Sequence, residues 1–173
     1  VDFNSNYEVL MPWYKDWFFY FLLGGIFFID QVTKHFIRSY IALGGSWPDE
    51  GFVRLVHGLN TGSAFGLFAG FTNFLIVASL IGIFLILYLF YRQNNNTIWM
   101  RISIGMIVGG AIGNLFDRVK DGGVVDFISV GWWPAFNIAD SAICIGMAIL
   151  VSIMLFGEKL GWGRRGQDED KGL

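Results

Sequence analysis

The stretch Thr72–Tyr91, with the sequence TNFLIVASLIGIFLILYLFY, contains no charged side chain over twenty residues. An α-helix needs about 20 consecutive, mostly apolar residues to cross the hydrocarbon core of a bilayer. The stretch is therefore expected to be a membrane-spanning helix. Three other runs, 17–36, 99–116 and 137–156, have the same apolar character with a few polar interruptions. The sequence predicts four transmembrane helices.

The composition of the whole chain agrees with a membrane protein. Of the 173 residues, 54% are hydrophobic and only 15% are charged, against about 25% charged residues in soluble domains. A net charge of −2 provides no basic surface for nucleic acid. One cysteine and two histidines argue against a disulfide and against a zinc or histidine-rich metal site. We therefore expect no cofactor and no nucleic-acid partner.

Lysines and arginines are distributed unequally between the two ends of the predicted helices. The end with both termini carries Lys15, Arg92, Arg101, Lys159, Arg164, Arg165 and Lys171. The other end carries Lys34, Arg38, Arg54, Arg118 and Lys120, of which Lys34 and Arg118 stand beside acidic residues and are expected to be ion-paired. By the positive-inside rule, both termini should be cytoplasmic.

The predicted fold is an all-α integral membrane protein with four transmembrane helices and a small extracytoplasmic, β-containing loop domain. The outer loops are 38–71, with a weak strand signal at 52–55, and 117–136. Residues 17–156 are expected to form the membrane domain, followed by a charged cytoplasmic tail at 157–173. The polar segment 1–16 lacks an initiator methionine, and part of it is expected to be non-native.

Polar residues of three predicted helices fall at one depth. With a rise of about 1.5 Å per residue, Asp30, Asn114 and Asp140 all lie roughly 20 to 26 Å from the cytoplasmic end. Ionisable residues at membrane depth are candidates for function because they are costly to bury there. Asp30 and Lys34 are spaced as an i,i+4 ion pair, which would hold the site or contact substrate. Asp117, with its neighbour Arg118, is expected to cap its helix.

Other polar or small residues have simpler interpretations. Gly105, Gly109 and Gly113 recur every four residues, which favours close packing of helices. Cys144 is expected to be an inert core thiol. Because the predicted site has two carboxylates and no clustered His or Cys, activity is expected to survive EDTA and thiol alkylation. His57 is expected to be a solvated surface side chain.

Asp126 and Asp140 differ from the other acids because no basic residue stands near either in the sequence. Asp140 follows the start of the fourth helix, where it would serve as an N-cap unless Asn137 takes that place. Two carboxylates brought together in a low-dielectric site share one proton, and such a pair hydrolyses amides by general acid–base chemistry. Ion binding and a structural role are the alternatives on spacing alone.

Five segments then resemble one family. They are DQVTK at 30–34, NTGSAF at 60–65, GGAIGNLFDR at 109–118, VVDF at 124–127 and FNIADS at 136–141. In this order, on four predicted spans, they resemble the lipoprotein signal peptidases (signal peptidase II) of bacteria. The chain departs from the usual pattern at Ser63, where alanine is common, and at His57-Gly58, which replaces an aromatic or basic stretch.

The resemblance implies an intramembrane-type aspartyl endopeptidase of the bacterial cytoplasmic (inner) membrane, with its site near the extracytoplasmic face. It would cleave the signal peptide from diacylglyceryl-modified prolipoproteins just before the lipidated cysteine. Membrane lipid and cyclic lipopeptide inhibitors are further expected partners. The catalytic pair would be Asp126 and Asp140. The residues matching the family's binding or supporting positions are Asp30, Lys34, Asn60, Gly62, Asn114, Arg118, Asn137 and Ala139.

Three other functions are alternatives to this one. An ion-coupled transporter or channel would use the same acids, but the sequence has no internal repeat and no acid at mid-membrane, where transporter sites lie. A presenilin-like protease would carry Tyr-Asp and Gly-x-Gly-Asp motifs, which are missing from the sequence. A purely structural membrane subunit would leave Asp126 unexplained.

Overall fold

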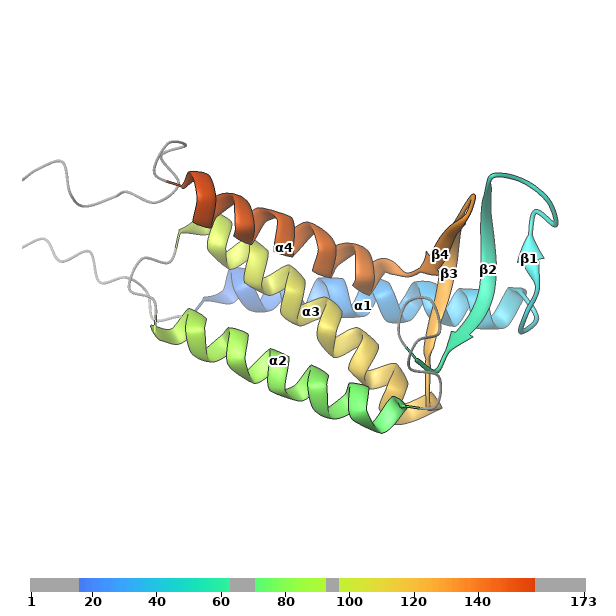
Figure 1. Cartoon of the computed structure of the whole chain (residues 1–173), viewed down its shortest axis with the longest axis horizontal. Helices are drawn as coiled ribbons and strands as arrows, with labels where there is room; N and C mark the ends of the chain where they lie inside the picture. Colours follow the sequence, from blue (N-terminus) through green and yellow to red (C-terminus); the bar gives the residue numbers. More distant parts are fainter. Residues whose placement is uncertain (1–15, 63–70, 93–96, 158–173) are drawn as a thin grey trace, which may run out of the picture.

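Four helices run along a common direction, and four short strands gather at one end of them (Figure 1). The computed structural model describes residues 16–62, 71–92 and 97–157. The helices are α1 (Trp17–Tyr40), α2 (Thr72–Arg92), α3 (Ile98–Asp121) and α4 (Ile138–Phe156). The strands are β1 (Ser46–Trp47), β2 (Val53–Asn60), β3 (Val124–Val130) and β4 (Trp133–Phe136).

Polar side chains begin three of the helices. Asp16 accepts a hydrogen bond from the Phe19 amide at the start of α1, and Thr97 accepts one from the Met100 amide at the start of α3. Asn137 caps α4. These bonds satisfy amides that have no partner within the helix. Helix α3 ends at Gly122, whose φ of 72° is the left-handed conformation that glycine adopts readily.

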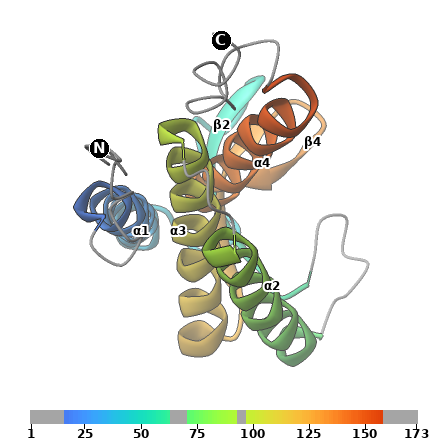
Figure 2. The same ribbon diagram turned by 90° about the vertical axis from the view of Figure 1, so that its left-hand side faces the viewer.

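Helix α3 lies at the centre, with α1, α2 and α4 around it (Figure 2). The predicted small-residue face packs against α1: a Cβ at Gly109 would lie 2.9 Å from the Leu23 carbonyl oxygen, and one at Gly113 would lie 2.7 Å from Asp30 Oδ2. On the α4 side, a Cβ at Gly110 would collide with the Ala139 carbonyl oxygen. Small residues therefore bring α1 and α4 close to α3, which confirms the packing prediction.

The outer surfaces of the helices are strongly apolar. Within the described ranges, α2, α3 and α4 are each long and apolar enough to cross a membrane. Most large side chains of α2 are exposed, including Phe84, Leu85 and Leu89, as expected for a helix that faces lipid. Helix α1 has 24 residues, which is also sufficient length, but its second half carries polar residues. The inner core is small and consists of Phe19, Phe90, Met100, Ile104 and Val108.

The strands form one antiparallel sheet in the order β1-β2-β3-β4. Strand β2 pairs with β3 so that Gly58 lies opposite Asp126 and Asn60 lies opposite Val124. Val125 and Phe127 of β3 are buried in a second core with Ile37 of α1. The sheet is thus attached to the C-terminal end of α1, and it brings residues from two distant loops together.

Two helices and one strand extend beyond the predicted segments. Helix α1 continues four residues beyond 36, and α3 continues five residues beyond 116 to Asp121. Charged side chains at these ends, including Arg38 and Asp121, pair with each other at 2.6 Å rather than ending the helices. The weak strand signal at 52–55 is the beginning of the longer β2. Ser63 and the rest of the segment 63–65, most of the segment 1–16 and most of the tail 157–173 lie outside the described residues.

Candidate active site

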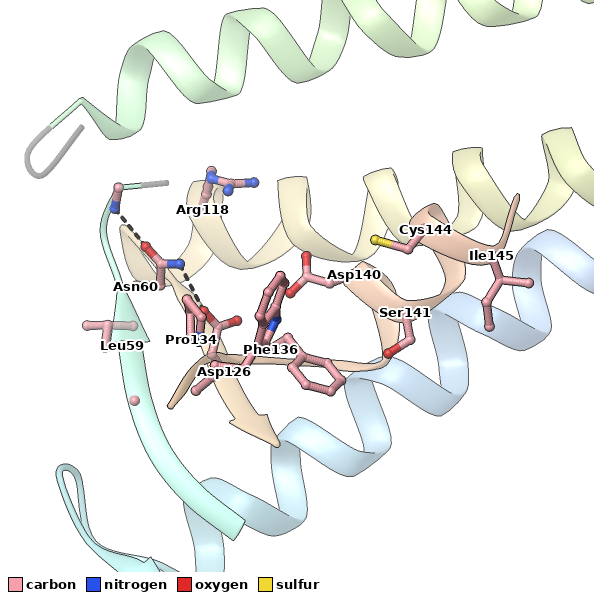
Figure 3. A pocket seen from close by; sticks show the side chains of 14 residues that line it. Leu59, Asn60, Arg118, Asp126, Pro134, Phe136, Asp140, Ser141, Cys144 and Ile145 are labelled. Atoms are coloured by element: carbon pink, nitrogen blue, oxygen red, sulfur yellow. Dashed lines mark hydrogen bonds between the residues drawn. The ribbon is translucent and has the colours of Figure 1, made fainter. Parts of the chain in front are cut away.

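A cavity of about 840 Å³ opens between the sheet, the C-terminal end of α3 and the N-terminal end of α4 (Figure 3). Its polar residues include two carboxylates, those of Asp126 and Asp140. The remaining wall is formed by Gly58, Leu59, Asn60, Gly62, Arg118, Trp133, Pro134, Ala135, Phe136, Ser141, Cys144 and Ile145. The structure therefore brings the two predicted catalytic acids to one cavity.

Asp126 lies on β3 and is only 5% exposed. Its Oδ2 accepts a hydrogen bond of 2.9 Å from Asn60 Nδ2, across the β2–β3 pair. Its Oδ1 accepts one of 2.8 Å from Asn137 Nδ2. Asn60 is itself held by the Gly62 amide, which donates to Asn60 Oδ1 at 3.0 Å. Both oxygens of the carboxylate are thus oriented by neutral amides.

Asp140 lies in the first turn of α4 and is half-buried. Its Oδ1 accepts a hydrogen bond of 2.7 Å from Asn114 Nδ2, and its Oδ2 accepts one of 3.2 Å from the Asn137 amide. The second bond belongs to a reciprocal capping box, because Asn137 Oδ1 accepts from the Asp140 amide at 2.9 Å. Asn137 is the N-cap, as one alternative predicted, but Asp140 also contributes to the cap and is not free of it.

Asn137 connects the two carboxylates. Its side chain donates to Asp126, and its main-chain amide donates to Asp140. It is fully buried, and its Nδ2 lies 3.2 Å from Asn114 Oδ1. The predicted supporting residues Asn114 and Asn137 therefore link α3, α4 and β3 beside the two acids.

Lys34 lies on the far side of Asn114 from the cavity and is 0% exposed. Its Nζ contacts Asp30 Oδ2 at 2.7 Å, Asp117 Oδ2 at 2.9 Å and Asn114 Oδ1 at 3.1 Å. An ammonium group has three N–H donors, and three oxygens surround it here. We call Asp30, Lys34 and Asp117 the lysine cluster. Since Lys34 also donates to Asn114, the cluster is connected to Asp140 through one amide.

Of the other predicted supporting residues, some line the cavity and one lies beside the lysine cluster. Asn60, Gly62 and Arg118 line the cavity. Ala139 lies behind it, and its amide donates to Asp30 Oδ1 at 2.9 Å. Arg118 Nη1 donates to the Asn114 carbonyl oxygen at 3.4 Å, while its buried Nε has no hydrogen-bond partner among the described residues.

Three single-residue predictions were wrong. Asp117 does not cap α3, because the helix continues to Asp121 and Asp117 is buried against Lys34. Cys144 is exposed and lines the cavity rather than the core. His57 is half-buried, and its Nδ1 lies 2.8 Å from the Ile41 carbonyl oxygen. The surroundings of these three residues depend on contacts with residues distant in sequence, or on the open space between elements, neither of which the sequence reveals.

The cavity wall formed by β4 was not predicted. Trp133, Pro134 and Phe136 of β4 line the same cavity as the two carboxylates, and Figure 3 shows Pro134 and Phe136 beside Asp126. The pairing of β4 with β3, Ile128 opposite Phe136 and Val130 opposite Trp133, places them there. The sequence signal that would have found them is the short link Gly131-Trp132 between two apolar segments, which is typical of a hairpin, and Gly131 adopts the positive φ of 54° in this turn.

Burial raises the pKa of Asp126 to about 6. Desolvation of the ionised form is the main cause, and the negative charge of Asp140 adds to it. Hydrogen bonds from Asn60 and Asn137 act in the opposite direction. Asp126 thus holds a proton more readily than an ordinary carboxyl group, as one member of an acid–base pair must.

Comparison with known proteins agrees with this geometry. A profile of the family described as signal peptidase (SPase) II matches residues 22–156. The chain belongs to the signal peptidase II family. A protein of Dehalococcoides mccartyi named lipoprotein signal peptidase is 41% identical over 130 residues, covering 73% of this chain and 81% of its own. Another of that name, from Syntrophotalea carbinolica, is 42% identical over 133 residues, covering 71% of this chain and 81% of its own.

Two solved structures resemble the fold, and both are described as bacterial membrane enzymes. One has a TM-score of 0.74 and 28% identity, covering 87% of this chain and 93% of its own. The other has a TM-score of 0.72 and 31% identity, covering 80% and 92%. Membership of the signal peptidase II family favours the peptidase over the transporter and presenilin-like alternatives, and it identifies the chain as an aspartic-type protease and a membrane protein.

Proposed function

We propose that Asp126 and Asp140 are the catalytic carboxylates with which this enzyme cleaves signal peptides from prolipoproteins. Removal of prolipoprotein signal peptides is the activity of the signal peptidase II family, to which the chain belongs. In this proposal, the peptide bond cleaved lies just before a cysteine that carries diacylglycerol. The supporting residues hold the two acids and line the cavity that receives the substrate.

One observation carries the proposal. Within the described ranges, the other buried acids all contact a cation: Asp16 contacts Arg101, and Asp30 and Asp117 contact Lys34. Asp126 and Asp140 form no ion pair there and accept hydrogen bonds only from amides. They also line the cavity, whereas the other three do not. These two acids remain free to exchange protons with a substrate.

The proposed reaction needs one proton between the two carboxylates. Asp140, ionised, accepts a proton from a water molecule, and the water oxygen attacks the carbonyl carbon of the scissile bond. Asp126, protonated, donates a hydrogen bond to the carbonyl oxygen and then supplies a proton for the departing amine. Such general acid–base catalysis contributes about 10²- to 10⁴-fold for each positioned group. The raised pKa of Asp126 supports giving it the acid role.

The apolar helices and the distribution of lysines and arginines support a membrane arrangement. We propose that α1 crosses the bilayer with the three apolar helices, and that both termini face the cytoplasm of a bacterial inner membrane. The beginning of α1 and the end of α4 lie at the end opposite the sheet (Figure 1). The larger number of lysines and arginines belongs to that end by sequence. The cavity would then lie near the extracytoplasmic face, where a lipid-anchored cysteine is found.

Cleavage by the purified protein tests this proposal. The detergent-solubilised enzyme is incubated with a diacylglyceryl-modified prolipoprotein, and mass spectrometry follows the substrate. The expected result is a loss of mass equal to the signal peptide, with and without EDTA. The same prolipoprotein without the lipid is the control and should be cleaved much more slowly. An unchanged mass, or activity that EDTA abolishes and zinc restores, would overturn the mechanism.

A further inference from the structure

Gly58 lies directly opposite Asp126 in the antiparallel pair of β2 and β3. Residues directly opposite each other in such a pair place their side chains on the same face of the sheet. Asn60, two residues along β2, directs its side chain to Asp126 on that face. A side chain at position 58 would therefore extend into the cavity beside Asp126, and Gly58 is one of the cavity's lining residues.

Neither the backbone nor the packing requires glycine at this position. The positive-φ glycines of the described residues are Gly44, Gly51, Gly122 and Gly131. A Cβ at Gly58 would meet one atom within 4 Å, the Asp126 carbonyl oxygen at 3.4 Å, which is an ordinary contact. Glycine within a strand lowers stability relative to alanine. The space in front of Gly58 thus belongs to the cavity.

A bulge in β2 brings this glycine into place. Leu55 pairs with Ile128 and Gly58 pairs with Asp126, so β2 has one more residue than β3 between these pairs. In regular register, His57 would stand opposite Asp126 instead. The bulge turns His57 away, where its Nδ1 lies 2.8 Å from the Ile41 carbonyl oxygen. Bulges beside active sites commonly redirect a side chain in this way.

The acids divide the cavity into two sides. Figure 3 shows Asp126 and Asp140 between Leu59 and Asn60 of β2 on one side and Cys144 and Ile145 of α4 on the other. The α4 side is apolar and suits the acyl chains of the lipidated cysteine. The residue that precedes the cleaved bond would then lie on the β2 side, next to Gly58.

We infer that Gly58 determines how large a side chain the enzyme accepts at the substrate residue immediately before the cleaved bond. This inference rests on the proposed function, because it assumes that the bond is cleaved between Asp126 and Asp140. With glycine at position 58, the cavity leaves room there for a side chain larger than a methyl group. Added carbon atoms at position 58 fill that room and restrict the enzyme to glycine or alanine.

The test compares wild type, Gly58→Ala and Gly58→Val on lipidated prolipoproteins that differ only in the residue before the cysteine: glycine, alanine or valine. The quantity measured is kcat/KM for each substrate relative to the glycine substrate. One methylene in a pocket changes such ratios by about 10- to 200-fold. We expect the valine-to-glycine ratio to fall by about tenfold in Gly58→Ala and further in Gly58→Val. Melting temperatures should stay level or rise.

Gly82→Ala is the matched control, because Gly82 of α2 is exposed, has no atom within 4 Å of an added Cβ and lies outside the cavity. Its ratios should equal those of wild type. If wild type cleaves the panel but all three enzymes give the same ratios, the inference about Gly58 is wrong while the proposed function stands. If the altered preference appears instead in a second panel of substrates, which differ only in the residue two before the cysteine, the placement of Gly58 is wrong. If wild type cleaves none of the substrates, the proposed function fails first.

Discussion

Two groups of aspartates lie side by side in this enzyme in opposite surroundings. In the lysine cluster, Asp30 and Asp117 are fully buried and contact Lys34 Nζ at 2.7 and 2.9 Å. At the cavity, Asp126 and Asp140 accept hydrogen bonds from amides and contact the open space. Asn114 joins the groups, because it accepts from Lys34 and donates to Asp140.

The difference explains how one residue type serves two purposes. A buried ammonium group is costly unless carboxylates neutralise it, so the acids of the lysine cluster form ion pairs that hold α1 and α3 together. The cavity acids form no ion pair among the described residues, and burial raises the pKa of Asp126. We therefore propose that Asp30 and Asp117, which contact a cation, stabilise the fold. Asp126 and Asp140, which accept hydrogen bonds from amides, are the proposed catalytic residues.

The largest effect is expected for the cavity acids. Asp126→Asn and Asp140→Asn each remove one of the two proposed catalytic carboxylates, and kcat/KM for a lipidated prolipoprotein should fall by about 10³-fold or more. The measurement is a steady-state cleavage assay on variants with intact helical circular dichroism. Asp49→Asn, an exposed acid of the β1–β2 loop, is the control and should cleave at the wild-type rate. Either cavity variant retaining full activity would remove that acid from the mechanism.

Removal of the cation should mainly affect stability. Lys34→Met leaves Asp30 and Asp117 buried without the ammonium, and the free energy of unfolding in detergent should fall by about 3 to 5 kcal/mol. The double variant Asp30→Asn with Lys34→Gln should regain part of this loss. In that variant, Asp117 still faces Arg38 Nη2 at 3.5 Å. A double variant less stable than Lys34→Met would contradict a structural ion pair.

The pH dependence of stability isolates Asp126. Its pKa rises from an ordinary value of 3.8 to about 6 on folding, so the folded state binds more protons than the unfolded state between these pH values. Stability therefore falls as the pH rises through this range, by about 3 kcal/mol at 1.36 kcal/mol per pKa unit. Asp126→Asn should lack this decrease, so its stability relative to wild type should improve between pH 4 and 8. Parallel stability curves for the two proteins would refute the raised pKa.

The smallest effect concerns Cys144, the single cysteine of the chain. Because Cys144 lines the cavity away from the carboxylates' hydrogen bonds, a small methylthio adduct should change kcat/KM by less than about twofold, whereas a bulky maleimide should reduce it several-fold by obstructing the cavity. Mass spectrometry confirms the labelling. Cys144→Ala is the control and should be insensitive to both reagents. If the maleimide changes kcat/KM as little as the methylthio adduct does, Cys144 lies outside the path of the substrate.

Hydrophobic runs predicted most of the helices, because an apolar stretch long enough to span a bilayer rarely adopts any structure other than a helix. They did not predict the extension of α3 to Asp121, since charged residues there are solvated or paired with Arg38. The lysine cluster was half predicted: the Asp30–Lys34 pair follows from i,i+4 spacing, whereas Asp117 is 83 residues from Lys34 in the chain. The partnership of Asn60 with Asp126 likewise depends on strand pairing across 66 residues.

The division of roles is tested most directly by melting temperatures of Asp126→Asn and Lys34→Met measured in one detergent at neutral pH. Asp126→Asn loses one acceptor, worth about 1 kcal/mol, but it also removes a desolvated charge. It should melt at or above the wild-type temperature while cleaving no substrate, and Lys34→Met should melt far lower. If Asp126→Asn melts as low as Lys34→Met, Asp126 is a structural residue and the account is wrong.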